Sequence, residues 1–139
     1  MFITRKAEFS ASHICAQQHL SEEQNHELYG AAANPNGHGH NYVLEVTLSG
    51  DPDPSTGMIF DLKKLKEILN QTVIEPMDHR FLNYEVRPFD KLVPTTENLC
   101  IEIFRRLAAF PRAKLERVRV EETNNNSFEY AGGPEVAGH

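Results

Sequence analysis

Residues 38–49 alternate strictly between two kinds of side chain, and this pattern constrains the fold more than any other part of the chain. The even positions are histidine, tyrosine or aliphatic, and the odd positions are mostly glycine or polar. Because successive side chains of a β-strand point to opposite faces, the segment is predicted to be a strand with one buried face. His38 and His40 lie on that face, so a single strand can present two imidazoles to one metal ion.

A third ligand is expected from a second alternating segment near the N-terminus. Phe9, Ala11 and His13 share one face of a predicted strand over 2–13, and His13 stands at its end. Three neutral imidazoles leave one open position on a tetrahedral zinc ion, as in catalytic rather than structural sites. The chain has only 2 cysteines, which excludes a cysteine-rich structural zinc site. We therefore expect zinc at His13, His38 and His40.

The composition favours one domain that acts on a small molecule. The 139 residues carry a formal net charge of -6 without a run of lysine or arginine, which argues against nucleic-acid and membrane-surface binding. No apolar segment is suited to spanning a bilayer or to acting as a leader, so a cytoplasmic location is expected. In that reducing compartment Cys15 and Cys100 are expected to be free thiols.

The remaining segments complete an α+β pattern. The predicted elements are strands over 2–13 and 38–49, helices beginning after Asp61 and after Thr95 or Thr96, and strands over 115–122 and 127–130. Pro76 and Pro111 are expected to end the helices, and residues 17–36 to form a long loop. The order ββααββ predicts a four-stranded antiparallel sheet with two helices on one face. Residues 1–130 would form this domain and 131–139 a flexible tail, and the open sheet edges favour oligomerisation.

Glu122 is the most unusual charged residue of the predicted strands. It shares a face with Val118 and Val120, where a carboxylate is costly unless it meets a partner or ligand. Thr95 or Thr96 can cap the second helix, and Glu97 then lies near the positive end of its dipole.

Several of these segments together resemble one protein family. They are Phe9–His13, Asn34–Tyr42, Asp53-Pro54 with Thr56-Gly57-Met58, Met77-Asp78-His79, Thr95–Asn98 and Glu122-Thr123. In this combination the chain resembles the 6-pyruvoyltetrahydropterin synthases and the wider group that includes the 6-carboxytetrahydropterin synthases. The resemblance runs nearly from end to end.

The resemblance implies the tunnelling fold, in which trimers form a barrel and two trimers stack into a homohexamer with active sites between subunits. It implies zinc held by His13, His38 and His40, and a pterin substrate, 7,8-dihydroneopterin triphosphate. Glu122 matches the pterin anchor, since a carboxylate can accept two hydrogen bonds from the amino-pyrimidine edge. The segment of Thr95, Thr96 and Glu97 matches residues that line the pterin site.

The implied activity is that of a carbon-oxygen lyase in tetrahydrobiopterin synthesis. Zinc binds the side-chain oxygens and acidifies the adjacent C-H bonds, and triphosphate leaves without net redox change. Asp78 and His79 match the proton-transfer pair, in which the carboxylate fixes the imidazole tautomer.

The chain departs from the family where the mammalian-type enzymes have their base, a cysteine six positions before the first histidine of His-Gly-His. This chain has Ala32 there. Three explanations compete. In the first, Cys15 replaces the base, and nearby zinc lowers the pKa of its thiol. In the second, the chain is an impaired enzyme that still binds zinc and pterin, and in the third, His79 acts alone with a zinc-bound hydroxide. The same residues are also compatible with a 6-carboxytetrahydropterin synthase of the queuosine pathway and, with less support, with a zinc hydrolase.

Overall fold

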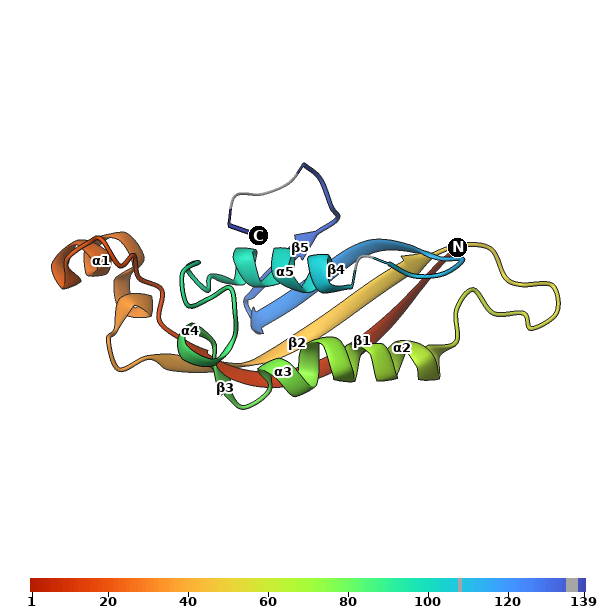
Figure 1. The fold of residues 1–139 in the computed structure, drawn as a ribbon, viewed down its shortest axis with the longest axis horizontal. Coiled ribbons are helices and arrows are strands. Elements are labelled where there is room, and N and C mark those ends of the chain that lie inside the picture. Colours follow the sequence, from red (N-terminus) through yellow and green to blue (C-terminus); the bar gives the residue numbers. More distant parts are fainter. Residues whose placement is uncertain (108, 135–137) are drawn as a thin grey trace.

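The computed structural model describes residues 1–107, 109–134 and 138–139, and its centre is one five-stranded sheet (Figure 1). In the order β3-β1-β2-β4-β5, the strands are Arg80–Phe81, Phe2–His13, His38–Ser49, Lys114–Thr123 and Asn126–Tyr130. The long antiparallel strands β1 and β2 pair from Phe2 with Ser49 to His13 with His38. All four strands expected from the sequence are present. The fifth, β3, pairs parallel to β1 at Ala11 and Ser12, so the predicted four-stranded, wholly antiparallel sheet was wrong. A strand of two residues is too short to show a period in the sequence.

The helical segments are α1 (Glu22–Tyr29), the 3-10 turn η1 (Gly30–Ala33), α2 (Leu62–Leu69), the π turn η2 (Asn70–Ile74), α3 (Glu75–Met77), α4 (Leu82–Glu85) and α5 (Thr96–Arg106). Helix α1 lies beyond the end of the strands, whereas α2 and α5 pack on one face of the sheet (Figure 1). Leu65 and Leu69 of α2 and Leu99 and Ile103 of α5 are buried in one core with the inward side chains of β2 and β4. The expectation that the helices pack on one face is therefore confirmed for α2 and α5.

Residues 17–36 do not form the predicted loop but contain α1 and η1, so the simple ββααββ order was also wrong. Helix α1 begins with a capping box, in which the Ser21 hydroxyl accepts from the Gln24 amide and the Gln24 side chain accepts from the Ser21 amide. The helix is polar and largely exposed, so it lacks the apolar stripe from which helices are predicted. Local capping, rather than burial, explains its formation.

Pro76 does not end the first core helix, contrary to the prediction. The chain widens into the π turn η2 and continues through Pro76 to Met77. A proline lacks a backbone N-H, so one helical bond is missing at Pro76, and the Thr72 carbonyl, four residues earlier, accepts from the Arg106 guanidinium at 3.4 Å instead. Asp78 and His79 follow directly, so this helix end determines where they lie.

The C-terminal segment beyond β5 has no helix or strand among its described residues, 131–134 and 138–139. His139 Nε2 lies 3.5 Å from Asn98 Oδ1, near the start of α5. The tail boundary at residue 131 stays a prediction, and residues 135–137 lie outside the described part of the chain.

Candidate metal centre and active site

Three histidine rings converge where β1 ends and β2 begins. His13 pairs with His38 across the two strands, and His40 lies two residues further along β2 on the same face. The Nε2 atom of His13 is 2.9 Å from that of His38 and 3.2 Å from that of His40. Gly37 makes the entry to β2 possible, because its φ of 77° is strained for other residues and a Cβ there would lie 2.8 Å from the Phe81 ring. The three histidines could hold one metal ion.

The orientation of His13 suits a metal ligand. The residue is 2 % exposed, and Nδ1 donates to the Pro94 carbonyl at 2.7 Å, which leaves the lone pair on Nε2 facing the other two rings. Burial lowers the pKa of both His13 and His40, chiefly by desolvation, and this favours the neutral form that binds metals. Nitrogen ligands on a common face, with their lone pairs directed at one another, fit a zinc ion.

Glu122 lies beside this cluster and has a side-chain partner there. One carboxylate oxygen is 4.0 Å from His40 Nε2 and also accepts a short hydrogen bond from the Thr96 hydroxyl. Thr96 is 2 % exposed, whereas Thr95 is the N-cap of α5, with its hydroxyl accepting from the Asn98 amide. Glu97 is exposed in the first turn. The start of α5 therefore brings Thr96 and Glu122 together next to the histidines.

Cys15 lies beside His13 and next to Ala32. Its amide donates to the Ala32 carbonyl at 2.9 Å, and its sulfur is 4.0 Å from His13 Nδ1. Burial, together with the carboxylates of Glu122 and Glu97, raises the pKa of the Cys15 thiol to about 11. The surrounding protein groups thus act against the lowered pKa expected from the sequence. Both Cys15 and Cys100 are free and buried.

Asp78 and His79 lie elsewhere, on the β3 side of β1. Asp78 accepts from the Ser10 amide at 2.8 Å and from His79 Nδ1 at 3.0 Å, and the His79 amide donates to the Ser10 carbonyl. Ser10 precedes His13 by three residues, a separation of about 10 Å along a strand. The His79 side chain is 82 % exposed. Among the described residues, no hydrogen bond or ion pair joins this pair to the three histidines, although His79 and His40 both line a cavity of about 450 Å³.

Nearly the whole chain is similar to one protein family. A family model described as 6-pyruvoyl tetrahydropterin synthase matches residues 2–133. The human 6-pyruvoyl tetrahydrobiopterin synthase is 42% identical over 131 residues, which cover 94% of this chain and 90% of the human protein. The chain belongs to the 6-pyruvoyl tetrahydropterin synthase family.

Two further proteins are similar to this chain, one in structure and one in sequence. The structure of the Caenorhabditis elegans 6-pyruvoyl tetrahydropterin synthase superposes with a TM-score of 0.90 at 40% identity and covers 96% of each chain. A protein of Archaeoglobus fulgidus described as a putative 6-carboxy-5,6,7,8-tetrahydropterin synthase is 39% identical over 88 residues, 63% of this chain and 70% of its own. The chain thus has the subunit fold of the synthases.

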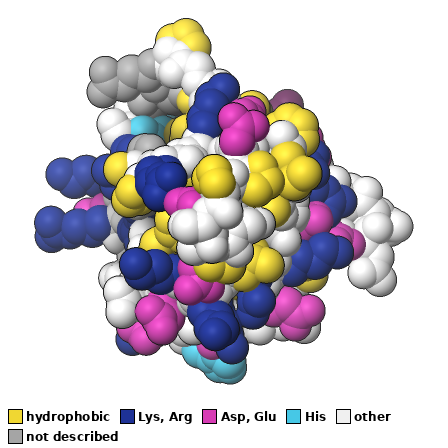
Figure 2. All heavy atoms as spheres, turned by 90° about the vertical axis from the view of Figure 1, so that its right-hand side faces the viewer, with side chains coloured by type: hydrophobic (Ala, Val, Ile, Leu, Met, Phe, Trp, Pro, Cys, Tyr) yellow, Lys and Arg dark blue, Asp and Glu magenta, His cyan; other side chains and the backbone are white. Residues whose placement is uncertain are grey.

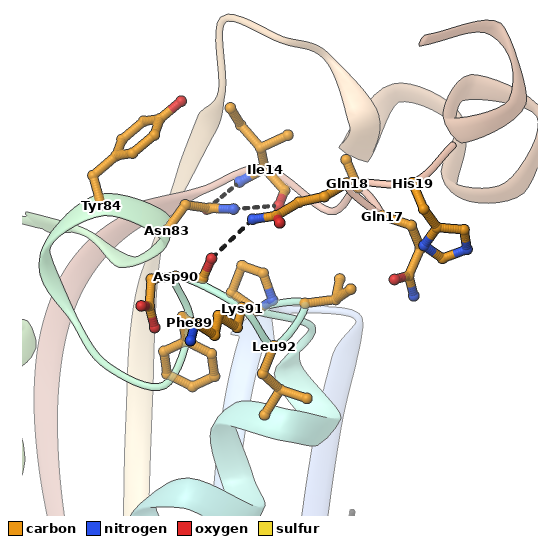
Figure 3. Close-up of a pocket in the computed structure, with 13 residues that line it drawn as sticks. Ile14, Gln17, Gln18, His19, Asn83, Tyr84, Phe89, Asp90, Lys91 and Leu92 are labelled. Atoms are coloured by element: carbon orange, nitrogen blue, oxygen red, sulfur yellow. Dashed lines mark hydrogen bonds between the residues drawn. The ribbon is translucent and has the colours of Figure 1, made fainter. Parts of the chain in front are cut away.

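The sequence did not predict the hydrogen-bonding groups that hold the segments next to His13 in place. In Figure 3, Asn83 binds both the amide and the carbonyl of Ile14, and Gln18 donates to the Asp90 carbonyl. These bonds join the segment after β1 to α4 and to the loop before α5, around a cavity of about 710 Å³ whose wall includes Pro94. Pro94 acts through its carbonyl, so no side-chain signal could have revealed it. Asn83 could have been suspected only as a polar residue between apolar neighbours.

One face of the molecule carries side chains of both charges. On the face shown in Figure 2, lysine and arginine side chains are interspersed with aspartate and glutamate. Within the described ranges, no helix combines the length and the apolar character needed to cross a bilayer.

Proposed function

We propose that this member of the family is a zinc-dependent lyase that acts on 7,8-dihydroneopterin triphosphate, releases triphosphate and forms a 6-pyruvoyl pterin in tetrahydrobiopterin synthesis. The observation that carries this proposal is the convergence of His13, His38 and His40 beside the half-buried carboxylate of Glu122. A three-histidine site next to a carboxylate provides a Lewis-acid position and an anchor for a hydrogen-bonding heterocycle.

The three histidines would hold zinc through Nε2, with His13 oriented by Pro94. Zinc, when bound, would polarise the side-chain oxygens of the substrate and make the adjacent C-H bonds more acidic. Glu122 would accept the N-H groups of the amino-pyrimidine edge, and Thr96 would fix one of its oxygens. Thr95 and Glu97 would line the same end of α5.

His79 would move protons, with Asp78 holding its Nδ1 and stabilising the charged imidazolium. Because this pair lies on the far side of β1 from β2 and His79 is largely exposed, we propose that it serves the metal centre of another copy. A homohexamer of two stacked trimers, with active sites between subunits, would bring these groups together. The edge strand β5, and the part of β1 before Ala11 that the short strand β3 does not pair with, offer backbone groups for such assembly.

The base that is absent at Ala32 has one candidate replacement among the nearby side chains. The Cys15 sulfur lies beside His13, and the Cys15 backbone is bonded to the Ala32 carbonyl. We propose Cys15 as the substitute proton acceptor, and the rival is an impaired enzyme that still binds zinc and pterin. A positioned base contributes roughly 100- to 10,000-fold to the rate, so the two explanations differ by a measurable amount.

The test is mass spectrometry of the products formed from 7,8-dihydroneopterin triphosphate by the zinc-loaded chain and by its Cys15→Ala and Ala32→Cys variants. We expect a 6-pyruvoyl product from the unaltered chain and loss of turnover in Cys15→Ala. Turnover in Ala32→Cys alone would instead identify an impaired enzyme. A 6-carboxy product would favour the activity named for the Archaeoglobus fulgidus relative. No product from any of the three would overturn the proposal.

A further inference from the structure

Glu102 is a buried carboxylate that the proposed mechanism does not use. It lies on α5 and is 0% exposed, next to Ile103 of the apolar core. Arg105 donates to it from two nitrogens, at 3.0 and 2.5 Å, and Arg106 Nε lies 3.8 Å from one of its oxygens. A buried charge is costly unless it is paired. Glu102 therefore holds two arginines at the C-terminal end of the helix.

The two arginines differ in the other groups that they reach. The Arg105 side chain is 56% exposed, and its hydrogen bonds go to Glu102. The Arg106 side chain is only 20% exposed, and it also donates to two main-chain carbonyls, from Nη1 to Thr72 at 3.4 Å and from Nη2 to Arg87 at 2.8 Å. Because a guanidinium has several N-H donors fixed in one plane, Arg106 can bind both carbonyls while it faces Glu102.

Thr72 and Arg87 lie at the two ends of the segment that carries Asp78 and His79. Thr72 belongs to η2, and Pro76, four residues later, has no N-H to offer its carbonyl. Arg87 lies shortly after α4, beyond β3. The Asp78 amide donates at 2.7 Å to the last carbonyl of η2, so a movement of η2 would also move the pair.

We propose that Arg106 is a positioning residue for His79: its guanidinium fastens both ends of the segment 72–87 to the C-terminal end of α5. Ser10 holds the middle of the same segment through its bonds to Asp78 and His79, so the loss of Arg106 should loosen the pair without releasing it. The part of this inference that concerns proton transfer rests on the proposed function, whereas the attachment of the segment to α5 does not.

The first arm of the test needs no ligand. Amide hydrogen exchange of the full-length, zinc-loaded chain is measured by mass spectrometry for Arg106→Lys, with Arg105→Lys as the matched control. A lysine keeps the charge that faces Glu102 but lacks the planar fork that binds both carbonyls. We expect exchange over 72–81 to become faster on the order of 3- to 10-fold in Arg106→Lys alone, and exchange over 38–49 to stay unchanged in both variants.

Three results of this arm would overturn the proposal. Equal acceleration over 72–81 and 38–49 would show that Arg106 only stabilises the whole fold. Equal acceleration over 72–81 in Arg105→Lys would assign the effect to Glu102 rather than to the two carbonyl contacts. Unchanged exchange over 72–81 in Arg106→Lys would show that these contacts do not hold the segment.

The second arm measures steady-state kinetics with 7,8-dihydroneopterin triphosphate. Arg106→Lys should lower kcat on the order of 3- to 10-fold and leave KM and zinc content unchanged, because a loosened His79 affects proton transfer rather than binding. In a His79→Ala background the same change should have no further effect, since the group that Arg106 positions is already absent. Additive losses, or a raised KM with unchanged kcat, would overturn the proposal. If the unaltered chain forms no product, the proposed function fails, and the first arm still decides whether Arg106 holds the segment.

Discussion

The three-histidine cluster and the Asp78–His79 pair both contact strand β1 but differ in burial and in the groups that hold them. The cluster is enclosed, with His13 2 % exposed and oriented by a main-chain carbonyl, whereas the His79 side chain is 82 % exposed. Asp78 and His79 are nevertheless fixed by Ser10, whose amide binds the Asp78 carboxylate and whose carbonyl binds the His79 amide. An exposed side chain in such a defined position is typical of a group that meets a partner rather than its own core. Of the two parts of the proposed site, one is thus completed within the chain and the other faces outward.

The strongest test of the enclosed half is His38→Ala. Loss of one of three ligands should reduce bound zinc and product formation to background, because two imidazoles do not hold the ion in this geometry. Metal analysis and product assays measure both effects. His19→Ala, which removes a histidine outside the cluster, should leave both unchanged. Retention of zinc in His38→Ala would refute the assigned ligand set.

The outward half should behave differently in the same assays. We expect His79→Ala to lower the rate by roughly 100- to 10,000-fold while zinc content remains that of the unaltered chain. His26→Ala, a second largely exposed histidine, is the control and should be fully active. A loss of zinc in His79→Ala would show that His79 contributes to metal binding, and would contradict its assignment as a proton-transfer group separate from the metal site.

Mixing the two inactive variants tests whether the halves come from different copies. If His79 acts on a neighbouring copy, an equal mixture of His38→Ala and His79→Ala subunits should regain activity at about one quarter of the sites. The measurement is the rate after joint refolding, compared with each variant refolded alone. A mixture no more active than its components would show that both halves act within one chain.

The smallest expected effect concerns the charge of Asp78. The Ser10 amide, followed by His79, holds the pKa of Asp78 below its ordinary value. Because the folded-state pKa is lowered, the stabilisation is present above the unfolded-state pKa and is lost as the pH falls through the lowered value. Asp78→Asn should therefore be slightly less stable than the unaltered chain at neutral pH, and the difference should vanish in acid. Urea titrations from neutral to acidic pH measure this, and Asp51→Asn in an exposed loop should show no such trend.

The sequence predicted those elements in which apolar side chains recur at the spacing of a strand or a helix, because that spacing indicates which face is buried. The alternation over 2–13 and 38–49 gave strands with the observed bounds, and Asp61 and Thr95 are the observed N-caps. Glu122 stood out because a carboxylate interrupted an apolar row.

The parts that could not be predicted depend on contacts between distant segments. β3 is too short for a period, and α1 forms through a local capping box without an apolar face. That Asp78 would bind the amide of Ser10, 68 residues earlier, depends on the path of the chain after α3. No single-residue pattern records such a path.

The bond from His13 to the Pro94 carbonyl has a consequence for how the centre tolerates mutation. A side-chain acceptor can be deleted by a single codon change, but every amino acid at position 94 would still bring a carbonyl oxygen. Substitutions there can shift the acceptor without abolishing it. The orientation of His13 therefore depends on the backbone path of a whole segment, from the contacts of Asn83 with Ile14 to the cap of α5. Single substitutions in this segment should change that orientation gradually rather than abolish it.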